Sequence, residues 1–128
     1  MTTNDVLKNA ADSPIAGKRV LIAEDDFYIA ADLAYAFERE GAVVVGPLST
    51  LAEGVAAASS GNPLDGAVLD INLFGERTYP LVDMLRERGV PCVLATGYGR
   101  SAIPILYQHI PHHQKPFDSQ AVIASLFG

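Results

Sequence analysis

Five apolar runs of strand length, separated by segments with helical periodicity, are the feature that most limits how this chain can fold. The runs cover residues 20–23, 43–46, 67–69 and 92–95, and a weaker one is centred on Ile110. Helical patterns follow the first three runs and the last. Strands that alternate with helices imply right-handed crossovers and a parallel sheet. We therefore expect an α/β fold, a flavodoxin-like, doubly wound five-stranded parallel sheet in the order 2-1-3-4-5.

Capping residues mark where the first two helices should begin and end. The first helix is predicted over residues 27–40, with Asp26 as its N-cap and Gly41 as its stop signal. The second helix should begin at the capping-box signature formed by Thr50 and Glu53. Both helices begin close to the ends of the preceding apolar runs, as short strand-to-helix connections require.

The second half of the chain is less regular. Helices are predicted over residues 79–88 and after Asp118, which is a suitable N-cap. Between them, residues 97–111 fit a helix poorly, because Pro104 interrupts the pattern and two glycines loosen its start. We expect a degenerate or mobile fourth helix in this segment.

Length and charge restrict the domain organisation and the partners. The 128 residues carry a formal net charge of −6, and we divide them into a flexible N-terminal arm (1–17) and one folded domain (18–128). An acidic chain without basic clusters argues against nucleic-acid binding. No apolar run approaches the roughly 20 residues of a membrane span. The lone Cys92 and the lack of a secretory signal predict a reduced, cytoplasmic protein.

Polar side chains follow the apolar runs at the sheet edge where binding sites of this fold lie. They are Glu24, Asp25, Asp70, Asn72, Thr96 and Lys115. Carboxylates held close together repel one another, and Mg2+ relieves that cost because it prefers oxygen ligands. An amine that precedes a proline is held extended, so Lys115 could reach the same edge and bind a phosphoryl oxygen. The pattern predicts a Mg2+ site; the alternative is that the acids are solvated loop residues.

Four short motifs occur in order along the chain. They are Val20-Leu-Ile-Ala-Glu-Asp-Asp, Asp70-Ile-Asn-Leu, Ala95-Thr-Gly-Tyr and Lys115-Pro-Phe. Together they resemble the receiver domain of response regulators, the phospho-acceptor proteins of two-component signalling. The segment Val93-Leu-Ala-Thr-Gly-Tyr-Gly further resembles the FAT GUY type of single-domain receivers, in which the fourth helix is reduced.

The resemblance implies a role for each acidic residue. Asp70 would accept the phosphoryl group. Asp25 would bind Mg2+ directly, and Glu24 would bind it directly or through water. Asp70 would also be a Mg2+ ligand, and Asn72 would contribute its main-chain carbonyl oxygen.

The resemblance also implies how the phosphoryl group is sensed. Thr96 and Lys115 would contact it and report its presence. Most receivers have Tyr or Phe three residues before this lysine, as a rotating switch residue. Here the position is His112, so the chain departs from the family pattern at the proposed switch.

By this resemblance the protein would be a stand-alone bacterial response regulator. Its phosphoryl donor would be a sensor histidine kinase or a histidine phosphotransfer protein. It would signal through contact with a downstream protein target or through a phosphorelay, and a homodimer is compatible with this role. We expect no output domain and no enzymatic turnover beyond self-catalysed phosphotransfer and autodephosphorylation.

Two alternatives remain open from the sequence. One is a receiver-like interaction module that is never phosphorylated. The other is a Mg2+-dependent phosphatase with an Asp nucleophile, which needs a second Asp two residues after the first. Asn72 occupies that place after Asp70, which argues against the phosphatase.

Overall fold

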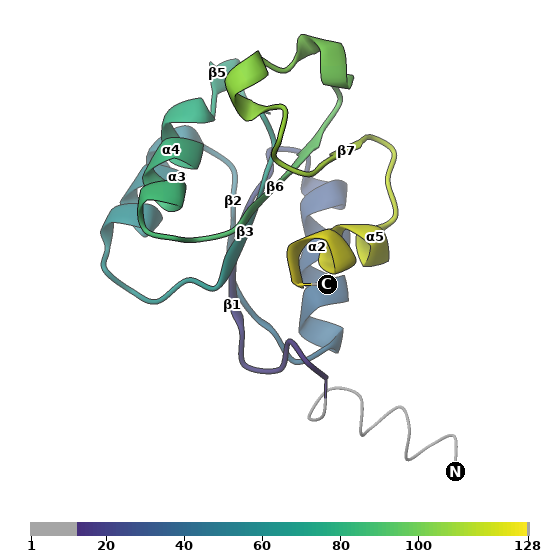
Figure 1. Ribbon diagram of the computed structural model, residues 1–128. Coiled ribbons are helices and arrows are strands. Elements are labelled where there is room, and N and C mark those ends of the chain that lie inside the picture. Colours follow the sequence, from purple (N-terminus) through teal and green to yellow (C-terminus); the bar gives the residue numbers. More distant parts are fainter. Residues whose placement is uncertain (1–12, 128) are drawn as a thin grey trace.

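Five parallel strands form the central sheet of the computed structural model, which describes residues 13–127. Neighbouring strands pair so that the second strand along the chain lies at one edge and the fifth at the other (Figure 1). This is the predicted order 2-1-3-4-5 and the predicted doubly wound α/β fold. In spatial order the strands are β2 (Val43–Leu48), β1 (Arg19–Ala23), β3 (Gly66–Leu69), β6 (Cys92–Thr96) and β7 (His112–Gln114).

Helices cover both faces of this sheet. Among residues 13–127 the α-helices are α2 (Phe27–Arg39), α3 (Leu51–Ser59), α4 (Tyr79–Glu87) and α5 (Ser119–Phe127). Helices α2 and α5 lie on one face, and α3 and α4 lie on the other (Figure 1). Because both faces are covered, the inner strands β3 and β6 are buried along their whole length. None of these helices is both long and apolar enough to span a membrane.

Strand β1 supplies side chains to two separate cores. Leu21 points toward α3 and α4, where Leu81 is a fully buried neighbour in the same cluster. Val20 and Ile22 point toward α2 and α5, and there they join Phe37. Burying a side chain of this size contributes about 1.5–3 kcal/mol. Packing on both faces therefore fixes β1, and with it the position of the residues that follow its carboxyl end.

The predicted capping residues are confirmed. The Asp26 side chain accepts hydrogen bonds from two backbone N–H groups in the first turn of α2, and Gly41 follows that helix with a φ of 86°. Thr50 and Glu53 form both halves of the capping box at the start of α3. These contacts satisfy backbone groups that a helix end otherwise leaves unpaired.

The segment after β6 has no regular helix, which confirms the degenerate fourth helix. Its regular pieces are two short 3-10 turns, η1 (Arg100–Ala102) and η2 (Ile105–Tyr107). The buried Ile103 anchors the segment to the α3–α4 core. Tyr107 stacks on Tyr79 of α4 at a ring-centroid distance of 4.5 Å, and its hydroxyl lies 3.0 Å from a carboxylate oxygen of Asp83. The segment is irregular, but it is fastened to α4.

The fifth strand was predicted around Ile110, and the structure corrects this position. β7 begins at His112, and the first hydrogen bond between β6 and this part of the chain runs from Leu94 N to Pro111 O. Ile110 lies in the preceding turn, where its N–H donates to Tyr107 O. Its side chain is nevertheless buried, which explains why the apolar signal lies two residues before the strand.

The predicted N-terminal arm lies mostly outside the described residues. Of residues 1–17, the structure describes only 13–17. Ile15 is buried in the core between the sheet and helices α2 and α5, and Gly17 N donates to Gly41 O at 2.9 Å. This last part of the predicted arm packs against the domain.

Candidate functional site

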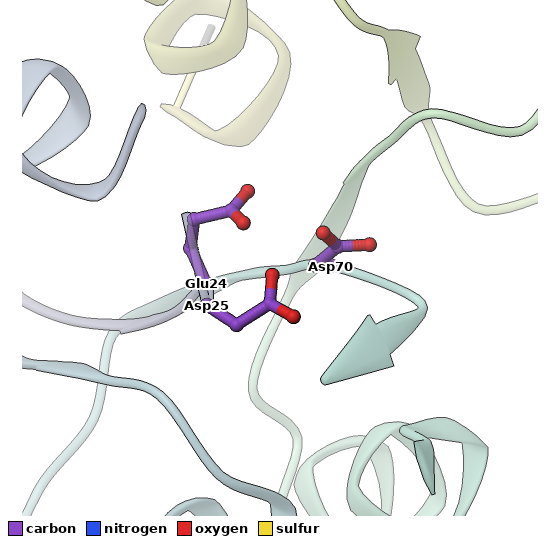
Figure 2. Close-up of side chains that lie close together, drawn as sticks. All are labelled: Glu24, Asp25 and Asp70. Carbon is purple, nitrogen blue, oxygen red and sulfur yellow. The ribbon is translucent and has the colours of Figure 1, made fainter. Parts of the chain in front are cut away.

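Three carboxylates meet at the carboxyl ends of two neighbouring strands (Figure 2). Glu24 and Asp25 follow β1, and Asp70 follows β3, which pairs directly with β1. One ligand oxygen of each residue lies within 4.8 Å of the others. Glu24 is only 3% exposed and Asp70 only 6%. The structure thus brings together the three acids that the sequence predicted as a cation site.

Lys115 reaches this cluster from the end of β7. Its Nζ atom lies 2.7 Å from Asp70 Oδ2 and 2.8 Å from Glu24 Oε1. Burial lowers the pKa of Lys115, but its close contacts with the carboxylates of Asp70 and Glu24 outweigh that effect, so the pKa lies above its usual value. The amine is therefore charged at neutral pH and lies between the two buried carboxylates.

Glu24 is the least well satisfied of the acids. Burial raises the pKa of Glu24 to about 7, against the opposing effects of Lys115 and of the Asp26 N–H group. Its Oε2 atom accepts a hydrogen bond from Asp26 N at 2.9 Å. The buried Oε1 atom has no hydrogen bond of good geometry and only the ion-pair contact with Lys115. Glu24 Oε1 therefore keeps lone-pair capacity beside two other acids, which makes it a suitable ligand for a hard cation.

The donor set fits Mg2+. Glu24, Asp25 and Asp70 offer only oxygen atoms, which Mg2+ prefers over nitrogen or sulfur. Asp25 is half-buried, and its Oδ2 accepts a hydrogen bond from Phe74 N at 2.9 Å. A carboxylate has further lone pairs beyond one such bond, so Asp25 keeps ligand capacity.

A hairpin that was not predicted from the sequence begins two residues after Asp70. It consists of β4 (Asn72–Leu73) and β5 (Glu76–Arg77). Asn72 N donates to Asp70 Oδ1 at 3.1 Å, so the backbone beside Asn72 lies next to the acid. The strands are two residues long, too short for a hydrophobic period. Gly75 is the turn signal that the sequence offers. In the structure Phe74 and Gly75 both have positive φ, which matches a tight hairpin turn.

Thr96 and His112 lie on the neighbouring strands β6 and β7. Thr96 ends β6, is fully buried, and accepts a hydrogen bond from Tyr98 N at 3.2 Å. Lys115 N donates to Thr96 O at 2.7 Å, which joins the two predicted phosphoryl-contact residues through the backbone. His112 lies half-buried in β7, paired with Leu94. Within residues 13–127 no side-chain hydrogen bond links His112 to the acids, and its switch role stays a prediction.

Comparisons with known proteins agree with this fold. The chain is 33% identical to SdrG from Sphingomonas melonis Fr1, with 88% of this chain and 98% of that chain covered and a TM-score of 0.75. A BeF3-activated conformation of SdrG, from Pseudomonas melonis Fr1, matches at 32% identity over 88% and 98% of the two chains, with a TM-score of 0.73.

A response regulator receiver protein from Sinorhizobium medicae WSM419 shares the fold. It matches at 21% identity over 86% of this chain and 91% of that chain, with a TM-score of 0.74. A scan against protein-family models and a search of curated proteins found no match. The chain belongs to the response regulator receiver family.

The receiver domain thus carries its acids, its lysine and its threonine at one end of the sheet. These residues were predicted from the sequence, but Thr78 was not; it is fully buried and donates from Oγ1 to the main-chain oxygen of Asp70 at 2.6 Å. Arg77 was not predicted either; its guanidinium donates to the Tyr98 hydroxyl at 2.9 Å. Neither residue has a sequence signal, because each depends on the hairpin.

Proposed function

We propose that Asp70 accepts a phosphoryl group from a phosphohistidine on a sensor histidine kinase or a histidine phosphotransfer protein. The observation that carries this proposal is the 2.7 Å contact between Lys115 Nζ and Asp70 Oδ2, next to Glu24 and Asp25. A buried carboxylate beside a charged amine, with two further acids that can help to hold a divalent cation, has the groups that phosphoryl transfer requires.

The transfer step is a displacement at phosphorus. One carboxylate oxygen of Asp70 forms the new P–O bond as the P–N bond of the phosphohistidine breaks, and the released imidazole takes up a proton. Lys115 holds one phosphoryl oxygen as a point charge. The Thr96 hydroxyl accepts from Tyr98 N, so its own proton is free to donate to a second phosphoryl oxygen.

Glu24, Asp25, Asp70 and the main-chain carbonyl oxygen of Asn72 would hold Mg2+. When bound, Mg2+ supplies positive charge that offsets the negative charge of the transferring group. Hydrolysis of the acyl phosphate by water returns the Asp70 carboxylate and releases inorganic phosphate. The protein therefore acts as a phospho-acceptor that resets itself, and not as an enzyme with a separate substrate.

The signal leaves the domain by contact with another protein. The added charge draws the Thr96 hydroxyl toward Asp70, where Lys115 already lies, and this favours one of two pre-existing arrangements of the β6–β7 edge. The partner is a downstream target protein or the next member of a phosphorelay. The buried, unpaired thiol of Cys92, the single cysteine of the chain, is in keeping with a cytoplasmic site of action.

Labelling with a small acyl-phosphate donor tests the acceptor. The wild-type protein should become phosphorylated when Mg2+ is present, and Asp70→Asn should abolish the label. Asp32→Asn, which changes an exposed acid on α2, is the matched control and should leave the label unchanged. Label that persists in Asp70→Asn contradicts the assignment. Absence of label in the wild type, from acyl phosphate and from purified histidine kinases alike, favours an interaction module that is not phosphorylated.

A further inference from the structure

The β4–β5 hairpin touches two of the acids through its backbone. Phe74 N donates to Asp25 Oδ2 at 2.9 Å, and Asn72 N donates to Asp70 Oδ1 at 3.1 Å. Asn72 also accepts a hydrogen bond from Gly75 N at 2.7 Å through its side-chain oxygen. The hairpin is therefore attached to the acid cluster at its turn and at its first residue.

Arg77 attaches the other side of this hairpin to the segment after β6. It pairs with Asn72 across the hairpin. Its guanidinium donates to the Tyr98 hydroxyl at 2.9 Å and lies 5.1 Å from the centroid of the Tyr98 ring. Within residues 13–127, Lys115 is the cation of every salt bridge, so Arg77 forms none. Arg77 thus contacts a neutral phenol twice, although it is an exposed cation in an acidic domain.

Tyr98 is the point where three contacts meet. Its hydroxyl accepts from Arg77 and also from Asn72 Nδ2, at 3.3 Å. Its backbone N–H donates to Thr96 Oγ1 at 3.2 Å. One residue therefore joins the hairpin to the threonine that would contact the phosphoryl group.

We propose that Arg77 is a positioning residue that holds the Tyr98 hydroxyl against Asn72 and thereby couples the cation site to residues 97–111. This inference rests on the proposed function, which assigns the main-chain carbonyl of Asn72 to Mg2+. The side chain of Asn72 is held at both ends, by Gly75 N and by Tyr98. Loss of the Arg77–Tyr98 contact releases one of those ends and lets the backbone of Asn72 shift away from the cation site.

A double-mutant cycle on Mg2+ affinity, measured by calorimetry, tests the inference. Arg77→Ala should weaken Mg2+ binding about three- to tenfold, the equivalent of one hydrogen bond. Tyr98→Phe keeps the ring but removes the hydroxyl, and should weaken binding to a similar extent. In the Tyr98→Phe background, Arg77→Ala should change the affinity less than about twofold, because the hydroxyl through which Arg77 acts on Asn72 is already absent.

Two further variants separate positioning from a general effect of charge. Arg77→Lys keeps a cation that can donate to the phenol, and should recover part of the lost affinity. Arg100→Ala removes an exposed arginine from the same segment and should bind Mg2+ like the wild type. If Arg77→Ala unfolds at a lower temperature than the wild type, Arg77→Gln replaces it in the cycle.

Backbone amide exchange gives a readout that a merely structural role would not change. In the wild type, Mg2+ should slow exchange in the hairpin and in residues 97–111. In Arg77→Ala, saturating Mg2+ should slow exchange in the hairpin alone. Unchanged Mg2+ affinity in Arg77→Ala, effects of Arg77→Ala and Tyr98→Phe that multiply independently, or no Mg2+ binding by the wild type would each overturn the inference.

Phosphorylation of Asp70, assayed in parallel, keeps the two proposals apart. If the wild type is phosphorylated and the effects of the two mutations on Mg2+ affinity are additive, the coupling through Arg77 is wrong and the phospho-acceptor role stands. If the wild type is not phosphorylated and the effects are non-additive, the coupling stands and the phospho-acceptor role is wrong.

Discussion

Thr78 Oγ1 donates a 2.6 Å hydrogen bond to the main-chain carbonyl oxygen of Asp70, eight residues earlier in the chain. Thr78 also donates from its backbone N–H to Ile71 O at 2.8 Å. Thr78 is the N-cap of α4, yet its side chain makes no cap hydrogen bond. Its hydroxyl instead closes the loop that carries the β4–β5 hairpin and fixes the backbone of the proposed phospho-acceptor.

Thr78→Val keeps the shape of this buried side chain and removes its donor. The Asp70 carbonyl oxygen then loses this partner in a buried setting, so the free energy of unfolding should fall by about 1–3 kcal/mol. Thr78→Ser retains the hydroxyl and is the control for the donor, at the cost of one buried methyl group. Urea unfolding measures both variants. A Thr78→Val protein as stable as the wild type would show that the bond contributes nothing net.

Lys115→Met removes the cation that lies between Glu24 and Asp70. Without it Glu24 and Asp70 lose their ion-pair partner in a buried setting, so the protein should unfold at a lower temperature in the presence of a chelator. Breaking a buried ion pair costs about 3–5 kcal/mol; we expect less here, since the Lys115 side chain keeps 19% exposure. Added Mg2+ should raise the unfolding temperature of Lys115→Met more than that of the wild type, because Mg2+ takes over the neutralisation.

Lys18→Met is the matched control, since Lys18 is exposed. It should respond to Mg2+ like the wild type. Thermal unfolding with chelator and with Mg2+ measures both variants. Equal Mg2+ responses in Lys115→Met and the wild type would contradict a cation site formed by these acids.

The sequence predicted the parts of this protein that depend on periodicity and on strand ends. Asp25 and Asp70 follow apolar runs, and the topology of a doubly wound sheet brings such residues to one edge. The hairpin contacts of Thr78 and Arg77 were not predictable in this way, because they depend on a turn with positive φ at Phe74. A phenylalanine there is uncommon, so the sequence carried only a weak turn signal.

The predicted position of β7 failed for a related reason. Apolar periodicity reports burial, and Ile110 is buried without being part of the strand. The residues of β7 are polar or half-buried, as expected for an edge strand that is covered on one side. A pattern based on hydrophobicity therefore identifies the buried Ile110 before the strand, and it does not identify the strand itself.

Gly54→Ala tests the packing between α3 and α4. A Cβ atom at Gly54 would lie 2.6 Å from Leu81 Cδ2, whose side chain is fully buried. Overpacking of this kind costs about 1–3 kcal/mol, which exceeds the roughly 1 kcal/mol that alanine contributes over glycine in a helix. We expect a net loss of stability in urea unfolding.

Gly97→Ala is the control for that substitution. A Cβ atom at Gly97 has no neighbour within 4 Å. The variant should therefore unfold within about 0.5 kcal/mol of the wild type. A Gly97→Ala protein that loses as much stability as Gly54→Ala would contradict the packing argument.

The thiol of Cys92 should make stability fall as the pH rises above 9. Burial raises the pKa of Cys92 from 9.0 to about 12. Between these values the unfolded chain releases the thiol proton and the folded protein keeps it, so the folded state binds more protons and the free energy of unfolding decreases with pH. The slope is at most about 1.4 kcal/mol per pH unit.

Cys92→Ala removes the titrating group, so the difference in unfolding free energy between wild type and variant should shrink over this range. Tyrosine ionisation contributes to both proteins and cancels in the difference. A difference that stays constant with pH would mean that the Cys92 thiol is open to solvent in the folded protein.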